Sequence, residues 1–192
     1  LVLEPRRLAA RAAAERMAAA LGQPAGDVVG YRTRLQSRVG PMTRVEVITE
    51  GVFSRMILDD PGLDGVAAVI FDEFHERSLD ADLGLALARD SQGLLREDLK
   101  ILVMSATLDI AGISRLLDDA PVIEAQGRAF PVETLHLGRN PVERIEDAMA
   151  RACLTALVDQ SGSVLAFLPG QGEIHRTVQR INERLRDPSV DV

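Results

Sequence analysis

The sequence is poor in cysteine and contains no long apolar run. Cys153 is the only cysteine, which excludes an internal disulfide framework and a metal cluster built from cysteines. No apolar stretch approaches the roughly 18 residues that a membrane-spanning helix needs, and no signal peptide opens the sequence. We therefore expect a cytoplasmic protein rather than a secreted or membrane-embedded one.

Lysine is nearly absent as well. Lys100 is the only lysine, so arginine carries almost all of the positive charge, and the net charge is −7. An acidic balance does not suggest a nucleic-acid-binding protein, but net charge averages over surfaces and one face can still be basic. Arginines are dense between Arg32 and Arg44. This stretch is either a solvated hairpin or a phosphate-binding patch, because arginine forks suit phosphate oxygens.

The sequence does contain an alternation of strand and helix patterns. Its composition, 46% hydrophobic and 27% charged, is typical of a globular protein, and 192 residues suggest one or two domains. The expected strands lie at 1–4, 27–35, 43–51, 65–71 and 100–104, and the expected helices at 5–21, 52–60, 78–95 and 110–119. The last two strands are apolar runs of the buried kind, and Ser78 is placed to cap a helix. The alternation predicts an α/β fold with a mostly parallel sheet.

The pattern loosens between Pro121 and Pro131, where prolines and a glycine interrupt it. We place a domain boundary near residues 125–130. A second series of strands and helices begins after it. Its strands are expected at 132–137 and 163–169, and its helices at 142–158 and 172–185.

Acidic residues directly follow the apolar run 65–71. Asp72 and Glu73 would lie beyond the carboxyl end of that strand, where open parallel sheets keep their ligand crevice. There an aspartate can hold Mg²⁺ through water, and an adjacent glutamate can orient or deprotonate an attacking water, as an NTPase requires. The pair could instead merely end the strand and begin a polar turn. A third reading makes Asp72, Glu73 and His75 direct metal ligands, although no other histidine is near in sequence.

A second polar cluster follows the next apolar strand. "SAT", residues 105–107, comes directly after the run 100–104. Because the carboxyl ends of parallel strands meet at one edge of the sheet, the hydroxyls of Ser105 and Thr107 are expected within hydrogen-bonding reach of His75 or Glu73. The two clusters together predict one shared site.

Several stretches of the sequence match a known set of motifs in the same order. They are "LEPRRLAA" at 3–10, "VGYRTR" at 29–34, "ITEG" at 48–51, "DEFHERS" at 72–78, "MSATLD" at 104–109 and "VLAFLPGQGEI" at 164–174. Over essentially its whole length the chain resembles the DEAH-box helicases of superfamily 2, most closely the bacterial HrpB type. A full set of motifs in order is highly specific, although Phe74 stands where many relatives have alanine.

The resemblance implies RecA-like domains and an ATP-dependent RNA helicase that uses ATP and Mg²⁺. Asp72 would be the acid that holds Mg²⁺, through water, and Glu73 would position the hydrolytic water, so both would line the nucleotide site. His75, Ser105 and Thr107 would link the nucleotide state to movement between the two domains. Arg77 would either order the loop by ion pairing or take a direct functional role.

The resemblance also implies contacts with the sugar-phosphate backbone of single-stranded RNA, which are independent of base sequence and sensitive to salt. The residues that would make them are Arg6, Arg7, Thr49, Glu50 and Gly51. Arg32 and Arg34 are expected near the same path, which shifts the arginine-dense stretch towards a functional reading. The motifs do not separate RNA from DNA, so RNA enters only through the resemblance.

The sequence also lacks parts that the family has. No "GxxxxGK[ST]" occurs, and in the family this phosphate loop lies just upstream of the stretch that begins at Leu1. Motifs V and VI, with their arginine finger, would follow the end of the sequence. We therefore expect a central fragment with a first RecA-like domain at 1–127 and the start of a second at 128–192. The alternatives are an inert single-strand-binding module and a DNA helicase of the same superfamily.

Overall fold

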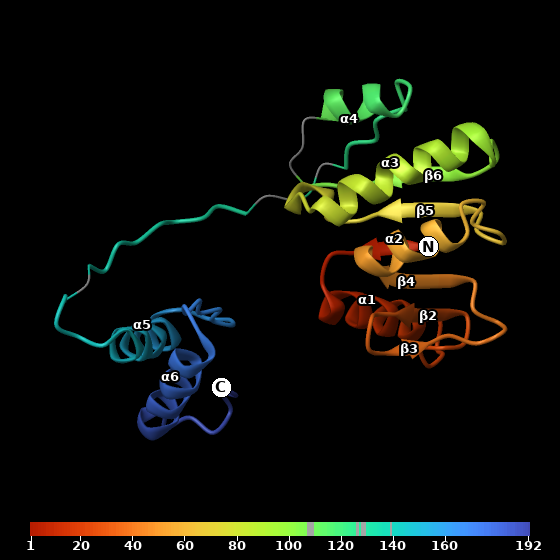
Figure 1. Ribbon diagram of the computed structural model, residues 1–192. Helices are drawn as coiled ribbons and strands as arrows, with labels where there is room; N and C mark the ends of the chain where they lie inside the picture. The colour runs from red at the N-terminus through yellow and green to blue at the C-terminus, as the bar shows by residue number, and fades with distance from the viewer. Residues whose placement is uncertain (107–109, 126, 128–129, 139) are drawn as a thin grey trace. The chain divides into compact units, whose positions relative to one another are not determined.

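A six-stranded sheet forms the centre of the first part of the chain (Figure 1). The computed structural model describes residues 1–106, 110–125, 127, 130–138 and 140–192. In spatial order the strands are β3 (Ser37–Arg38), β2 (Val29–Arg32), β4 (Val45–Thr49), β1 (Val2–Glu4), β5 (Ala68–Phe71) and β6 (Lys100–Val103). All neighbouring pairs are parallel except β2 with β3. The predicted α/β class with a mostly parallel sheet is confirmed.

Helices cover both faces of this sheet. They are α1 (Arg7–Ala20), α2 (Glu50–Asp59), α3 (Leu79–Leu94) and α4 (Ile110–Leu116), with a 3-10 turn η1 (Phe74–Glu76) after β5. Strand alternation sends Val2 and Val47 to one face, where α1 packs, and Leu3 and Ile48 to the other, where α2 and α3 pack. The chain therefore forms three layers, with helices outside and the sheet between them.

An alanine row lets α1 approach the sheet closely. Ala10, Ala14 and Ala18 recur every four residues on one face of the helix and are at most 1% exposed. They pack on Val29 and Val47. The helix predicted at 5–21 is confirmed with slightly shorter bounds, Arg7–Ala20.

Strand β6 differs from its prediction as a buried strand. Within the described residues only β5 pairs with it, so it is an edge strand. Lys100 is exposed and Leu102 is 49% exposed, while Ile101 and Val103 are partly buried against the core. An apolar run is buried on both faces only when neighbouring elements cover it, and here the described residues cover it from one side.

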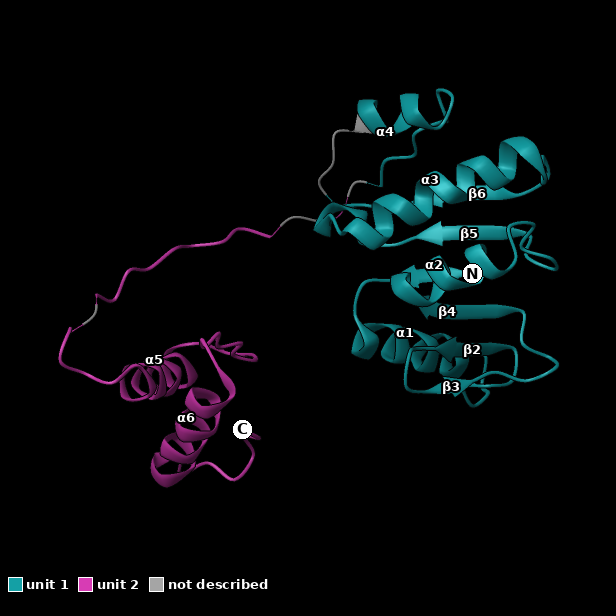
Figure 2. Ribbon diagram, viewed as in Figure 1, with its two compact units in different colours: residues 1–125 teal, residues 126–192 magenta. Residues whose placement is uncertain are grey.

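The chain divides into two compact units, Leu1–Ala125 and Gln126–Val192 (Figure 2). The second unit contains α5 (Ile145–Asp159) and α6 (Gln171–Arg184), which pack around Ala150, Cys153 and Ile181. No described helix in either unit is long and apolar enough to cross a membrane. The assignment of the units to two RecA-like domains stays a prediction.

The strands predicted at 132–137 and 163–169 are wrong. Neither segment forms a strand, and the described part of the second unit contains none. Leu165 and Phe167 are 79% and 81% exposed. A strand is stable only when another strand satisfies its backbone N–H and C=O groups, and these segments find no such partner in the described residues.

Candidate functional site

The predicted site residues lie along one edge of the sheet. Because β2, β4, β1, β5 and β6 are parallel, their carboxyl ends all reach this edge, in that spatial order. Arg34 follows β2, Thr49 ends β4, Arg6 follows β1, Asp72 follows β5 and Ser105 follows β6. The predicted arginines therefore follow β2 and β1, and the acids Asp72 and Glu73 follow β5.

We name the two parts of this edge by their side chains. The arginine half comprises Arg6, Arg7, Arg32, Arg34 and residues 49–51, and the acid half comprises Asp72, Glu73, His75 and Ser105. The halves adjoin where β1 neighbours β5.

The backbone of the loop after β5 is unusual. Glu73 and Arg77 both have φ of 50°, in the left-handed region that residues other than glycine rarely occupy. The Asp72 Oδ1 atom accepts a hydrogen bond from the Glu73 N–H at 2.7 Å. The Phe74 N–H donates to the Met104 carbonyl at 3.1 Å, which joins the loop to the end of β6. Such backbone strain persists only where surrounding contacts impose it.

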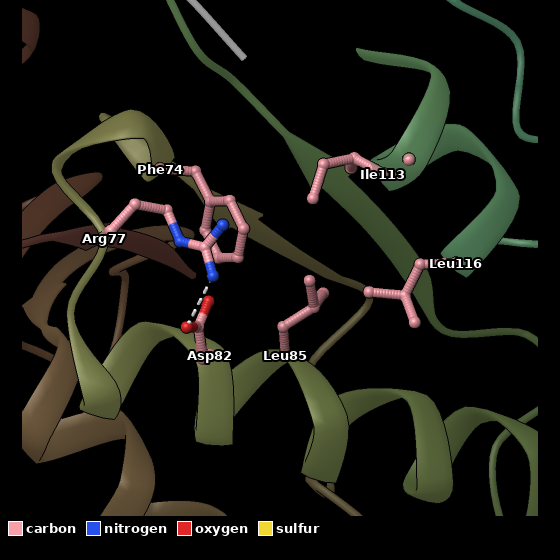
Figure 3. A pocket seen from close by; sticks show the side chains of 7 residues that line it. Phe74, Arg77, Asp82, Leu85, Ile113 and Leu116 are labelled. Carbon is pink, nitrogen blue, oxygen red and sulfur yellow. Dashed lines mark hydrogen bonds and ion pairs between the residues drawn. The ribbon is translucent and has the colours of Figure 1, made fainter. Parts of the chain in front are cut away.

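Phe74 supplies the main packing contact of this loop. Its side chain is 2% exposed and meets Phe71 edge to face at 6.1 Å, and Phe71 meets Phe53 of α2 in the same way at 5.7 Å. The Arg77 guanidinium lies 6.0 Å from the Phe74 ring centroid and pairs with Asp82 at 2.9 Å (Figure 3). Of the two readings of Arg77, these contacts favour the one in which it orders the loop.

A cavity of about 360 Å³ lies beside this anchor, between the loop, α3 and α4 (Figure 3). Phe74, Arg77 and Asp82 line one part of it, and Leu85 and Ile113 line another. None of the acid-half residues lines this cavity. The cavity therefore lies beside the side chains that hold the loop and not beside Asp72 and Glu73.

His75 connects the two strand ends of the acid half. Its Nδ1 atom accepts a hydrogen bond from the Ala106 N–H at 3.4 Å, and its Nε2 atom lies 3.3 Å from Glu73 Oε2. His75 therefore contacts both the Glu73 carboxylate and the backbone that follows β6. The contact observed between the two clusters runs through the backbone of Ala106, and the predicted link through the hydroxyls of Ser105 and Thr107 stays a prediction. Thr107 lies outside the described residues.

Glu4 joins this acidic group and was missed by the sequence prediction. It ends β1, and its residue is 7% exposed. Burial, followed by the charges of Asp72 and Glu73 and a side-chain hydrogen bond with Asp72, raises the pKa of Glu4 to about 7. The signal was present in the sequence, because Glu4 ends an apolar run just as Asp72 follows one.

The acids do not form a complete metal cage. Among the described residues, no group of three or more His, Cys, Asp or Glu side chains is arranged to hold a metal ion. The reading of Asp72, Glu73 and His75 as direct metal ligands therefore has no support. Mg²⁺ usually keeps several waters and is held by one or two carboxylates together with substrate phosphates, a donor type that Asp72 provides.

The arginine half is more exposed. The Arg6 side chain is 72% exposed and pairs with Glu76 at 2.8 Å. Arg32 pairs with Glu46 at 2.6 Å. Arg7 and Arg34 are exposed and form no ion pair within the described part of the chain, so they are available to an external anion.

Residues 49–51 lie where β4 passes into α2. Thr49 ends the strand, and Glu50 and Gly51 begin the helix, whose first backbone N–H groups have no partner within the helix. The Glu50 carboxylate does not face outwards: the residue is 8% exposed, and the Ser78 hydroxyl donates a hydrogen bond to it. Burial raises the pKa of Glu50. Only the backbone of Glu50, and not its carboxylate, is therefore free to contact a nucleic-acid strand.

Sequence comparison shows which known proteins this chain is similar to. No family model matches the chain. The chain is 54% identical to the ATP-dependent RNA helicase HrpB of Escherichia coli (strain K12), over 96% of this chain and 23% of the relative. It is 33% identical to the ATP-dependent RNA helicase HrpA homolog of Haemophilus influenzae, over 94% of this chain and 14% of the relative.

Solved structures agree with the sequence comparison. The crystal structure of the Escherichia coli DEAH/RHA helicase HrpB matches 97% of this chain with a TM-score of 0.89, and the match covers 24% of that structure. A crystal structure of the E. coli DExH-box NTPase HrpB matches 96% of this chain with a TM-score of 0.74. Over nearly its whole length the chain is similar to a segment of DEAH-box helicases. In sequence and in structure it is similar to a segment of HrpB, and it spans less than a quarter of the length of the curated relatives it matches.

Proposed function

We propose that the chain is a central segment of an ATP-dependent RNA helicase, which couples ATP hydrolysis to movement along RNA or to its unwinding. The observation that carries the proposal is the contact chain Glu73–His75–Ala106, which ties an acid at the end of β5 to the end of β6. Its supporting evidence is the similarity to HrpB and HrpA relatives named as RNA helicases. A cytoplasmic location remains our expectation from the sequence.

In this proposal the acid half performs hydrolysis. Glu73 orients the attacking water and takes its proton, while His75, 3.3 Å from the Glu73 carboxylate, packs beside it. Asp72 would hold Mg²⁺, which would neutralise charge on the phosphate oxygens when bound. Ser105 and Thr107 are proposed to transmit the nucleotide state to the second domain.

The arginine half binds the RNA strand in this proposal. Arg6, Arg7 and Arg34 supply exposed guanidinium groups, and the first backbone N–H groups of α2 at 49–51 add donors for phosphate oxygens. Contacts of this kind read the backbone and not the bases. Arg32 contributes near the same path and is already paired with Glu46.

A second candidate is an inert single-strand-binding module derived from a helicase, and a DNA helicase is a variant of the first. The observation in favour of the module is that no "GxxxxGK[ST]" occurs in the 192 residues. Its presence elsewhere in the complete polypeptide would favour the enzyme, and its absence would favour the module.

The decisive experiment replaces one carboxylate. In the complete polypeptide that carries this segment, Glu73→Gln is expected to lower ATP turnover by about 10²- to 10⁴-fold, because the general base is lost. ATP binding is expected to persist, because Glu73 does not hold phosphates. Glu97→Gln, at an exposed glutamate outside the site, is the matched control and should turn over normally. Normal turnover by Glu73→Gln would contradict the assignment.

A further inference from the structure

One ion pair joins the arginine half to the loop that carries Glu73. The Arg6 Nη2 atom donates to Glu76 Oε1 at 2.8 Å across 70 residues of sequence. Among the described residues it is the only ion pair between the arginine half and the loop that carries Glu73. The Arg6 side chain is 72% exposed and that of Glu76 33%, so solvent and external anions can reach the pair.

Glu76 is closely connected to the hydrolytic carboxylate. It ends η1, and its N–H donates to the Glu73 carbonyl at 2.9 Å. The flanking residues Glu73 and Arg77 both have positive φ, so the short turn between them has little conformational freedom. A movement of the Glu76 backbone would therefore act directly on the backbone that carries Glu73 and His75.

Two other residues of the loop, Phe74 and Ser78, are held by contacts that do not involve Arg6. Ser78 donates to the buried Glu50 carboxylate and caps α3 by accepting from the Ala81 N–H at 2.9 Å. Phe74 is fixed by its packing against Phe71. The loop contacts the arginine half through the Ser78–Glu50 hydrogen bond and the Arg6–Glu76 ion pair. The first is partly buried and the second is exposed, so only at Glu76 can an external anion replace the carboxylate.

The chemistry of Arg6 makes exchange favourable. A guanidinium offers several N–H donors to a carboxylate or to a phosphate, and a phosphate that approaches Arg6 brings a second anion beside Glu76. Exposed ion pairs are weak, so an RNA phosphate can replace the carboxylate at small cost. The two anions compete for one cation.

We propose that Glu76 is a positioning residue that occupies Arg6 in the absence of RNA and is displaced by a strand phosphate, so that strand binding resets the loop that carries Glu73. The inference rests on the proposed function and adds to it a residue and a route for RNA stimulation of hydrolysis. By reciprocity, a loop arrangement that releases Glu76 from Arg6 also favours strand binding.

The test uses Glu76→Gln in the complete polypeptide, with fluorescently labelled oligo-uridine as the strand. Loss of the competing charge should tighten strand binding about two- to fivefold at low salt. ATP turnover without RNA should rise, so that the ratio of RNA-stimulated to unstimulated kcat falls. Glu76→Asp keeps the charge on a shorter side chain and should give a smaller change. Glu15→Gln, at the exposed Arg11–Glu15 pair of α1, is the matched control and should bind like the unmodified protein.

A double-variant cycle separates this role from a merely structural one. With Arg6→Ala in place, Glu76→Gln should no longer tighten strand binding, because its effect requires Arg6. Unchanged affinity in Glu76→Gln, or an equal gain in the Arg6→Ala background, would overturn the inference. If Glu76→Gln does not fold, Glu76→Asp is compared with the unmodified protein. Tighter strand binding by Glu76→Asp supports the inference, and equal binding contradicts it.

The same data separate this inference from the proposed function. If the unmodified protein neither binds the strand nor hydrolyses ATP faster with RNA, the helicase proposal itself fails. If it does both and Glu76→Gln changes neither, only the role of Glu76 fails.

Discussion

The acid half and the arginine half of the sheet edge are built differently. In the acid half, Glu73 is fixed by a left-handed backbone, His75 bridges to Ala106, and the loop that carries both is anchored by the buried Phe74. In the arginine half, Arg7 is exposed and, within the described residues, without an ion pair. The proposed roles would account for this difference, because placing one water for attack requires fixed geometry, whereas contacting a nucleic-acid backbone requires charge and reach.

The largest expected effect is that the isolated chain loses ATP hydrolysis, assigned to the acid half, but keeps strand binding, assigned to the arginine half. The purified 192-residue chain should show no measurable RNA-stimulated ATPase, because no "GxxxxGK[ST]" loop occurs in these 192 residues to hold the β- and γ-phosphates. The same chain should still bind single strands weakly and in a salt-sensitive way.

Turnover and strand binding by this chain should be measured on a sample of intact mass 20.8 kDa. The complete polypeptide, assayed in parallel, is the control. Robust ATP hydrolysis by the chain alone would contradict the assignment of the acid half.

The next effect tests the anchor of the acid half. Phe74→Ala removes a buried ring that packs on Phe71 and under Arg77, and should lower the free energy of unfolding by about 3–5 kcal/mol. Denaturant unfolding of the chain measures this. Leu94→Ala, at a side chain that is 81% exposed, is the control and should change the free energy by less than about 0.5 kcal/mol. Equal effects of the two variants would mean that Phe74 does not anchor the loop.

The sequence predicts the local parts of this site well. Asp72 and Glu73 follow an apolar strand, and the structure places them at the carboxyl edge as that pattern indicates. Ser78 was predicted to cap a helix, and its hydroxyl accepts from the Ala81 N–H. These features depend on neighbouring residues only, which explains why a single sequence suffices.

Contacts between distant segments could not be predicted in this way. Arg6 meets Glu76, and Glu50 meets Ser78, because β1 lies between β4 and β5, an order that no local pattern contains. The same reason explains the failed strands at 132–137 and 163–169. Apolar residues there indicate strand propensity, but the strand forms only with a partner.

A smaller effect concerns the pH dependence of stability at the junction of the halves. The pKa of Glu4 is raised to about 7, above the ordinary value of 4.5. As pH rises through this window only the unfolded state loses its proton, so the free energy of unfolding falls, by up to about 3 kcal/mol. Glu4→Gln cannot ionise and should not show this fall.

The pH prediction is measured by thermal melts between pH 5 and pH 8, in a buffer with chelator so that no Mg²⁺ binds near Asp72. The exposed Glu97→Gln is the control and should follow the unmodified chain. Parallel pH profiles for Glu4→Gln and the unmodified chain would show that Glu4 is already ionised in the folded state.

The smallest effect tests the arginine half alone. Arg6→Ala with Arg7→Ala, in the complete polypeptide, should weaken single-strand binding about tenfold at low salt and to the same extent for different base sequences. Two lost phosphate contacts should also reduce the salt dependence, by about 0.7 per contact in the slope of log K against log salt. Stability should change little, because both side chains are exposed.

The control for this variant carries the same change of charge at another place. Arg11→Ala with Arg16→Ala removes two exposed arginines of α1 that lie beyond its first turn, away from the strand ends. If net charge alone governed binding, the two double variants would weaken it equally. We expect the Arg6 and Arg7 pair to weaken it far more, because only these arginines lie at the carboxyl edge beside residues 49–51. A loss confined to one base sequence would mean that this half reads bases and not the backbone.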